Sequence, residues 1–215
     1  MSSMDFVAVL QQVNRDLLAF EMAKSGFSRQ LKAITSIPLV GANNRNPVSK
    51  TEFKELGAAG FIIDQISAEA LIGIVANAIE TFAIRLLRHQ NTTWEPFKHP
   101  RDDLAFSSRP RQFRALNNVF KHQEGYIDSS TSRSAKFLVE KGFFKNETYL
   151  KQMSAESILP EMELSAFEAF AHLHFITLSI AGIKSSIEGA QREELVQGLR
   201  EQAIYPIITP ALFRE

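Results

Sequence analysis

Residues 61–90 decide the fold of this chain, and their sequence is FIIDQISAEALIGIVANAIETFAIRLLRHQ. Apolar residues recur there every three or four positions, a spacing that places them along one side of an α-helix. The members of that stripe are Ile63, Ile66, Ala70, Ile74, Ala78, Ile79 and Phe82. The other sides are largely apolar too, since they carry Leu71, Val75, Leu86 and Leu87. A helix that is apolar on several sides is typical of the centre of a bundle.

The segments around this central helix also have helical patterns. Residues 4–25 carry apolar side chains every three or four positions and are followed by Gly26. Residues 109–122 follow two serines and have Pro110 in the first turn, and residues 160–187 begin at a proline with two glutamates close behind it. Such residues mark the ends of helices. With the central helix, the sequence therefore predicts four principal helices.

Shorter helices are expected beside the principal ones. These accessory segments are 28–36, 133–141 and 190–203. Ser49, with Glu52 three residues later, has the pattern of a capping box that opens a helix. No useful run alternates apolar and polar residues as a strand would. We therefore expect an all-α fold, an antiparallel helical bundle with about four main helices, in a single domain 1–215 with an irregular tail from about residue 204.

Composition and charge exclude several classes of protein. The chain has 215 residues and no cysteine, and its 24 Lys plus Arg balance 24 Asp plus Glu. Without cysteine it can form neither a disulfide-stabilised module nor a thiolate-held zinc or iron–sulfur site. A neutral chain is also unlike a protein that binds nucleic acid over its whole surface, because such a surface needs a large positive excess.

Nothing in the sequence predicts export or insertion into a membrane. The N-terminus lacks the basic stretch of a secretory signal peptide. The two most apolar stretches, 58–87 and 162–183, are both interrupted by charged residues. Neither has the roughly 18 uninterrupted apolar residues of a transmembrane helix. We therefore expect a cytoplasmic protein that makes no contact with a membrane.

The zero net charge is the sum of two regions of opposite sign. The basic window, residues 98–122, has six lysines and arginines against two aspartates and so carries about +4. The acidic stretch, residues 152–183, has four glutamates and neither lysine nor arginine. A local phosphate-binding site in the basic window is therefore compatible with a neutral chain.

The chemically informative segment of the basic window is 109–125, with the sequence RPRQFRALNNVFKHQEG. On a helix, Arg114, Asn118 and His122 are spaced i, i+4 and i+8, so they line one face. The residues expected on the opposite, core side are Phe113, Leu116 and Phe120. The polar face combines an imidazole with amides and cations, which suits an anion or a phosphate group.

The same residues also have a purely structural interpretation. A protonated His122 would stabilise the C-terminal turn of its helix, where cations are favoured. Arg109 and Arg111 would then be solvated side chains of the first turn. Asn77 and Glu80, three apart in the central helix, are polar groups that need partners or a cleft if they are buried. The sequence leaves both interpretations open.

The run NNVFKHQEG, followed by Ser134, Leu138, Val139 and Gly142, resembles HEPN-like proteins. These are helical bundles common in prokaryotic toxin–antitoxin and phage-defence systems. The resemblance implies a metal-independent ribonuclease, in which a histidine and an arginine act at the scissile phosphate, often in a site shared across a dimer interface. It depends on this segment, while the rest of the chain agrees only in the order of its helices.

One position departs from the pattern of that family. Seven residues separate Arg114 from His122, which is more than the family has between its arginine and its histidine. Asn117 stands at the spacing where the arginine is expected. An amide cannot match a guanidinium in stabilising a charged phosphate transition state. Arg114, two turns away on the same helix face, is the residue that could act in its place.

The hypothesis of RNA cleavage gives these residues definite roles. His122 would be the general acid–base, because imidazole titrates near neutral pH, and Arg114 and Asn117 would complete the catalytic set. The expected substrate-binding residues are Asn118, Lys121, Arg111 and Arg109. Asn77 and Glu80 would orient the imidazole from the neighbouring helix. No metal and no cofactor is expected.

The remaining histidines are expected to have no metal-binding role. His172 and His174 lie two apart on a helix and therefore diverge, so they cannot chelate one ion together. Glu168 precedes His172 by four residues and could pair with it. His89 and His99 lie at or beyond the end of the long helix, where they are expected to face solvent.

Three functions are compatible with the sequence. The first is a HEPN-like RNA endonuclease of a bacterial toxin–antitoxin or phage-defence system. The second is a non-catalytic helical module that binds RNA or a partner protein within a larger defence complex. The third is a sensor with a small-ligand pocket near Asn77 and Glu80. The expected partners are RNA, an antitoxin or other defence protein, and a second copy in a homodimer.

Overall fold

The structure, a computed structural model, describes residues 6–35, 49–90 and 104–180 of the chain. Its elements are α1 (Phe6–Thr35), α2 (Lys50–Gln90), α3 (Ser108–Gln123), β1 (Tyr126–Ile127), α4 (Arg133–Glu140), β2 (Thr148–Tyr149), a 3-10 turn (Leu150–Gln152), α5 (Ala155–Ile158) and α6 (Met162–Ile180). The expected all-α fold is confirmed. The two short strands, which pair antiparallel with each other, are the only sheet in the described part of the chain.

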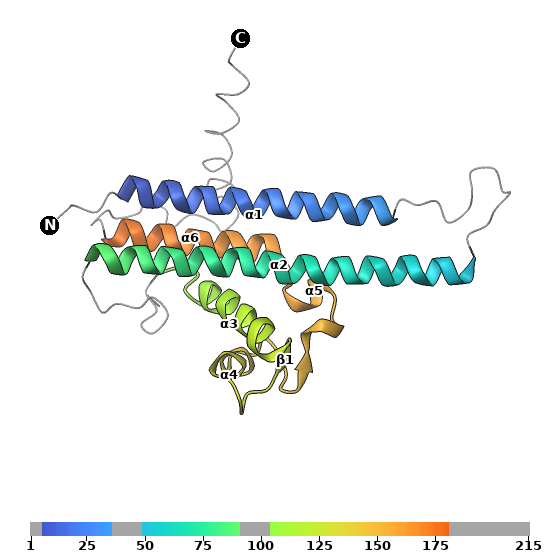
Figure 1. The fold of residues 1–215 in the computed structure, drawn as a ribbon. Coiled ribbons are helices and arrows are strands. Elements are labelled where there is room, and N and C mark those ends of the chain that lie inside the picture. The colour runs from blue at the N-terminus through green and yellow to red at the C-terminus, as the bar shows by residue number, and fades with distance from the viewer. Residues whose placement is uncertain (1–5, 36–48, 91–103, 181–215) are drawn as a thin grey trace, which may run out of the picture.

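Three long helices form the main layer of the molecule (Figure 1). α1 and α2 lie side by side in opposite directions, and α6 packs against both of them. α6 runs in the same direction as α2, because α3, α4 and α5 return the chain to the middle of α2 before α6 begins. The bundle is therefore antiparallel between α1 and its two neighbours and parallel between α2 and α6.

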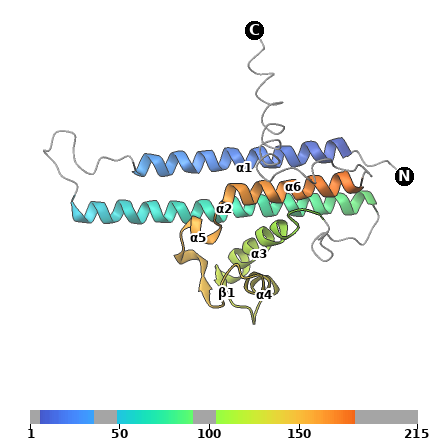
Figure 2. The same cartoon turned by 180° about the vertical axis from the view of Figure 1, so that it is seen from behind.

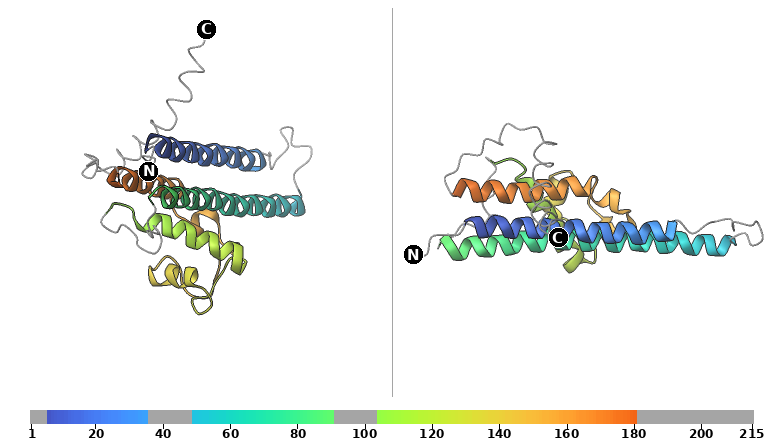
Figure 3. Two further views of the ribbon diagram at one scale, coloured as in Figure 1. Left: turned by 60° about the vertical axis from the view of Figure 1, so that its left-hand side comes forward. Right: turned by 90° about the horizontal axis from the view of Figure 1, so that it is seen from above.

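α3 and α4 form a second layer on the side of α2 that faces away from α1. α3 packs against α2 and α6, and α4 packs against α3 (Figure 2). The view turned by 60° in Figure 3 places α3 between α2 and α4. Two sides of α3 are therefore covered by other helices, and its outer side is left open.

The central helix begins eleven residues earlier than the 61–90 segment predicted, at Lys50. The expected capping box is present at this end. The Ser49 amide donates to Glu52 Oε2 over 2.7 Å, and the Glu52 amide donates to Ser49 Oγ over 3.2 Å. These two bonds satisfy amide groups that the first turn leaves without partners. The helix that starts at the box continues without a break into the apolar segment.

α1 also continues further than expected, because the prediction of a break at Gly26 is wrong. Residues 4–25 and 28–36 were expected as two helices, whereas one helix runs from Phe6 to Thr35. A glycine inside a helix costs only about 1 kcal/mol relative to alanine. Ala23 and Phe27 in the neighbouring turns pack against the core, and α1 packs along α2. This packing stabilises the continuous helix by more than the glycine costs.

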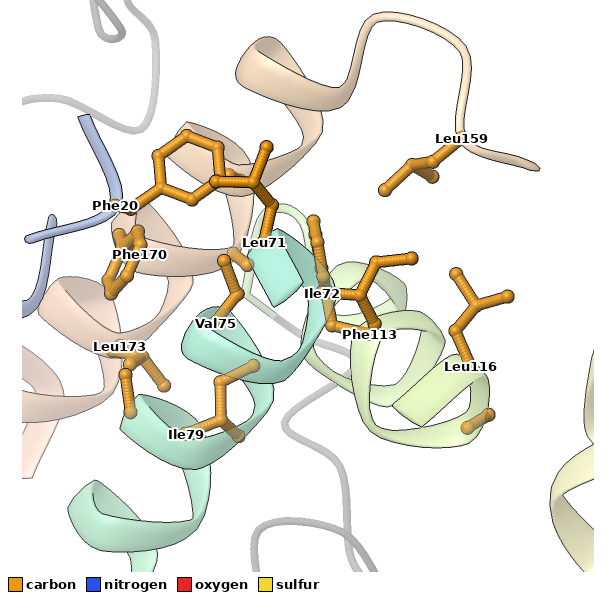
Figure 4. Close-up of a cluster of buried hydrophobic side chains, with 14 of the residues drawn as sticks. Phe20, Leu71, Ile72, Val75, Ile79, Phe113, Leu116, Leu159, Phe170 and Leu173 are labelled. Carbon is orange, nitrogen blue, oxygen red and sulfur yellow. The ribbon is translucent and has the colours of Figure 1, made fainter. Parts of the chain in front are cut away.

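The core lies where α1, α2, α3 and α6 meet. Figure 4 shows the cluster: Phe20, Leu71, Val75, Phe170 and Leu173 gather on one side of α2, and Ile72 faces Phe113 and Leu116 of α3. The predicted core stripe is confirmed at Ala78, Ile79 and Phe82, which are buried, and the buried side of the helix differs from it before them. Ile66 is 57% exposed, while Ala68, Ile72 and Val75 are fully buried. A helix that is apolar on several sides does not specify from its own sequence which side its neighbours will cover.

The connection between α4 and α6 is fixed to the middle of α2. The Ala155 amide, in the first turn of α5, donates to Asp64 Oδ2 over 2.8 Å. The Gln65 side chain donates to the Met153 carbonyl over the same distance. β1 and β2 pair just before this point, with Tyr126 opposite Tyr149. These contacts hold α5 against α2 and set where α6 starts.

Some expectations lie outside the described residues. They are the helix at 190–203, the tail from about 204, the end of the 160–187 helix beyond Ile180, and His99. Of the described helices, α2 alone is long and apolar enough to cross a membrane, by length and composition only. The central helix of a bundle meets the same criterion, so this is weak evidence for a membrane span.

Candidate functional site

The basic segment singled out in the sequence forms α3. Its first turn has Pro110, whose missing N–H needs no partner there, and Ser107 precedes it without a side-chain capping bond. The helix ends at Glu124 and Gly125, both with positive φ. The Gly125 amide donates to the Val119 carbonyl over 3.1 Å. A side chain at Gly125 would also approach Lys151 to within 3.1 Å, so glycine is required at this turn.

The outer side of α3 carries the polar row expected from the sequence. Arg114 and Asn118 are half-buried, and Lys121 and His122 are exposed. The opposite side is core, with Phe113 and Leu116 fully buried. We call Arg111, Arg114, Asn118, Lys121 and His122 the α3 polar face.

Arg114 is paired across to α2. Its Nε lies 3.6 Å from Glu80 Oε1, and both side chains are about two-fifths exposed. The Glu80 carboxylate, expected to orient the His122 imidazole, lies beside Arg114, two turns earlier on α3. Asn77 is exposed and does not project into the core. A partly exposed pair of this kind contributes little to stability, although the Arg114 Nε atom itself is buried.

The two asparagines of α3 point in different directions. Asn117 is only 5% exposed, and its Oδ1 lies 3.7 Å from where a side chain on Gly73 of α2 would begin. It therefore belongs to the interface between α2 and α3, beside Gly73. Asn118 donates from Nδ2 to Ser134 Oγ of α4 over 3.1 Å. The sequence analysis predicted that Asn117 and Asn118 contact a substrate. In the structure, both amides make contacts between helices of one protomer.

The two arginines of the first turn also have protein partners. The guanidinium of Arg111 lies over the ring of Phe137 at 4.7 Å from its centroid. Arg109 Nε donates to Glu168 Oε2 over 2.5 Å, and its Nη1 donates to Gln112 over 2.9 Å. The Glu168 side chain is 3% exposed, whereas that of Arg109 is 26% exposed. Arg109 therefore neutralises a buried carboxylate and is not part of the α3 polar face.

The sequence did not predict the buried cluster of polar side chains at the start of α3. Besides Arg109 and Glu168, it includes His172, whose Nδ1 donates to the Ala105 carbonyl over 2.8 Å. The spacing of Glu168 and His172 was a signal that they belong together. Their partners, however, lie about sixty residues away in the chain, and no local pattern predicts such a contact. A small cavity beside the cluster is lined by Ile79, Phe82, Ser107, Pro110, Arg111, His172, Leu173 and Ile176.

His174, the neighbour of this cluster on α6, faces α1. Its Nε2 donates to Asn14 Oδ1 over 3.0 Å. Burial lowers the pKa of this imidazole from 6.5 to about 4, because the charged form loses its hydration there. The ring is therefore neutral at neutral pH. Across the described ranges, no group of three or more His, Asp or Glu side chains is arranged to hold a metal ion.

The geometry of the α3 polar face limits its chemistry. Arg114 and His122 are eight residues apart, which is about 12 Å along a helix axis. One phosphate group cannot contact both near their backbones, whereas a strand of several nucleotides can follow the row. Lys121 precedes His122 in the chain and is exposed, as His122 is. Within one protomer, the polar side chains therefore form an extended row along α3 and do not converge on one point.

Comparison with known proteins gives no relative for this arrangement. No family model matches the chain, no curated protein matches its sequence, and no solved structure matches its fold.

Proposed function

We propose that this chain is a HEPN-like helical module of a bacterial toxin–antitoxin or phage-defence system, and that its α3 polar face binds RNA phosphates. The supporting observation is the end of that face, where Lys121 and His122 are both exposed to solvent. Arg111 and Arg114 extend it with side chains that remain partly exposed. A row of cations with aromatic and amide neighbours suits a phosphate backbone.

RNA cleavage is the second candidate function, and the exposure of His122 favours it. An accessible imidazole can take the proton of a ribose 2′-hydroxyl and return one to the leaving oxygen. The distance along α3 from His122 to Arg114 counts against strong charge stabilisation by that arginine. Binding with weak or no cleavage is therefore the function that the geometry supports better.

The remaining parts of the proposal concern partners and location. We propose a cytoplasmic protein that works as a homodimer beside an antitoxin or another defence protein. The Arg114–Glu80 pair supports regulation by competition, since a phosphate and the Glu80 carboxylate would bind the same guanidinium. The sensor hypothesis stays a prediction, and the small cavity described above lies beside His172 and Ser107.

Charge reversal on the α3 polar face tests the binding proposal. We expect Lys121→Glu to weaken the affinity for single-stranded RNA by about tenfold, because it removes one phosphate contact and adds a repulsive one. The matched control is Lys145→Glu, which changes the same charge at an exposed position after α4. Fluorescence anisotropy with a labelled oligonucleotide measures both. Equal affinities for the two variants would contradict the proposal.

A cleavage assay separates the two candidate functions. The wild-type chain is incubated with RNA in the presence of a chelator, alongside His122→Ala. If the chain is an endonuclease, the wild type cleaves without metal and His122→Ala loses at least about a hundredfold in rate, as for a general acid–base. If it only binds, the RNA stays intact in both samples while His122→Ala keeps its affinity within a few-fold.

A further inference from the structure

α1 and α2 project beyond the rest of the described bundle. The third helix, α6, begins at Met162, and its first turn is joined to α1 by the ion pair of Glu163 with Lys24. On α2, the last covering contact is the bond from the Ala155 amide to Asp64. Past these two points, α1 and α2 continue side by side with no third described element upon them, as Figures 1 and 3 show. We call residues 25–35 of α1 and 50–63 of α2 the projecting pair.

The core side of α2 continues into the projecting pair without a cover. By the helical repeat, Phe53 and Phe61 lie on the same side of α2 as Leu71 and Val75. Leu71 and Val75 are 6% and 0% exposed, whereas Phe53 and Phe61 are 55% and 43% exposed. The segment before Phe61 also carries the charged residues Lys50, Glu52, Lys54 and Glu55, and α6 does not extend over it (Figure 1). Phe27, on the core side of α1, is only partly buried at the facing position.

Two glycines lie on this uncovered side. Gly57 and Gly60 are inside a continuous helix, where each costs up to about 1 kcal/mol relative to alanine. A side chain added at either would meet nothing within 4 Å, and neither has a positive φ. Nothing in the described protomer therefore requires glycine at these positions. The two glycines leave a flat surface on this side of α2 that allows another helix to approach closely.

We propose that a second copy of this chain covers the projecting pair, so that two pairs pack face to face about a two-fold axis near Gly57 and Gly60. Two helices from each copy then complete a four-helix bundle, and the partner's pair takes the place that α6 occupies further along. The contact is self-complementary, because the same surface of each copy covers the same surface of the other. The inference rests on the homodimer proposed above and assigns its surface.

The size of the face fits this occupant. The projecting part of α2 is about 20 Å long, and two helices side by side are about 20 Å wide. The flat projection is therefore about 400 Å² per copy, and side chains add to the accessible area. Packing two such faces removes on the order of 1,000 Å² or more from solvent, which is the lower range for specific interfaces. A single added helix would cover about half of that face.

The first test is the mass of the full chain in solution. Sedimentation velocity over a wide concentration series should show a species of twice 24.2 kDa. Phe61→Asp places a carboxylate in the proposed contact and should raise the dimer dissociation constant by more than tenfold. The control is Ile84→Asp on the same helix, since Ile84 is similarly exposed at 49% but lies outside the projecting pair. Both positions are exposed, and circular dichroism checks that the helix content is unchanged.

The second test uses the absence of cysteine from the chain. Gly57→Cys should form a disulfide-linked dimer under mild oxidation, because a residue near the axis meets its own copy within disulfide range. Ile84→Cys should stay a monomer on a non-reducing gel. A crosslink at Ile84→Cys with none at Gly57→Cys would overturn the assignment of the surface.

Three other outcomes would also overturn it. The wild type could remain monomeric at every concentration, or it could form a dimer that Phe61→Asp leaves intact. It could also remain monomeric in buffer and float with phosphatidylcholine vesicles, which would make a lipid surface the cover of the projecting pair. RNA plays no part in these measurements. An intact dimer without RNA binding would therefore contradict only the proposed function, and RNA binding by a monomer would contradict only this inference.

Discussion

Arg109→Ala is expected to cost about 3 kcal/mol of folding stability, because it removes the Arg109 cation from the buried Glu168 carboxylate. The Glu168 side chain is 3% exposed, and Arg109 Nε is its charged partner at 2.5 Å. Removing one member of a buried pair typically costs about 3–5 kcal/mol, and the partial exposure of Arg109 places this case at the lower end. Urea unfolding monitored by circular dichroism measures the loss.

The matched control for this prediction is Arg111→Ala in the same turn of α3. Its guanidinium lies over the Phe137 ring, a contact worth about 1 kcal/mol or less at a partly exposed site. A second variant, Arg109→Met with Glu168→Leu, should recover most of the stability, because it removes both charges and keeps their volume. Equal losses of folding stability for Arg109→Ala and Arg111→Ala would contradict the prediction that the Arg109–Glu168 pair stabilises the position of α3.

Lowering the pH from 7 to 4 is expected to remove about 3 kcal/mol of stability through His174 alone. Burial sets the pKa of this imidazole at about 4, against 6.5 when it is exposed in the unfolded chain. Between these values the unfolded state binds the proton and the folded state does not, so stability falls as the pH falls. The difference of about 2.5 pKa units corresponds to about 3 kcal/mol. The contribution is complete above pH 6.5 and disappears by about pH 4.

The comparison that isolates this effect is between the wild type and His174→Gln across the same pH series. Burial raises the pKa of Asp16 on α1, so that group stabilises the fold at low pH and opposes the trend. Subtracting the two unfolding curves cancels Asp16 and every other shared group. A difference that stays constant from pH 7 to pH 4 would show that His174 is not the buried neutral imidazole described here.

The helical fold was predictable because its signals are local. Apolar spacing identified residues 61–90 as a central helix, and the structure shows that this helix begins earlier, at the Ser49–Glu52 capping box. The errors arose where tertiary contacts decide. Ile66 was placed in the core stripe and is exposed, because α6 and α3 cover a different side of α2. Gly26 was expected to end a helix, and packing against α2 carries the helix through it.

The candidate site was predictable only as a row of residue types on one helix. The spacing of Arg114, Asn118 and His122 placed them on the outer side of α3, and none of the three is buried. Their partners could not be read from the sequence. Asn118 bonds Ser134 across to α4, and Glu80 meets Arg114 from α2, because the angle between helices determines these contacts. Only Lys121 and His122 are left as exposed neighbours at the end of the row.

The most direct test of RNA binding by the α3 polar face is the affinity of the wild-type chain for single-stranded RNA as a function of salt. If about three cations of this face contact phosphates, the logarithm of the affinity should fall against the logarithm of salt concentration with a slope of about −2. Lys121→Glu should make that slope shallower by about 0.7, the contribution of one phosphate contact. An affinity that does not change with salt, or the absence of binding at low salt, would contradict the assignment of this face to RNA.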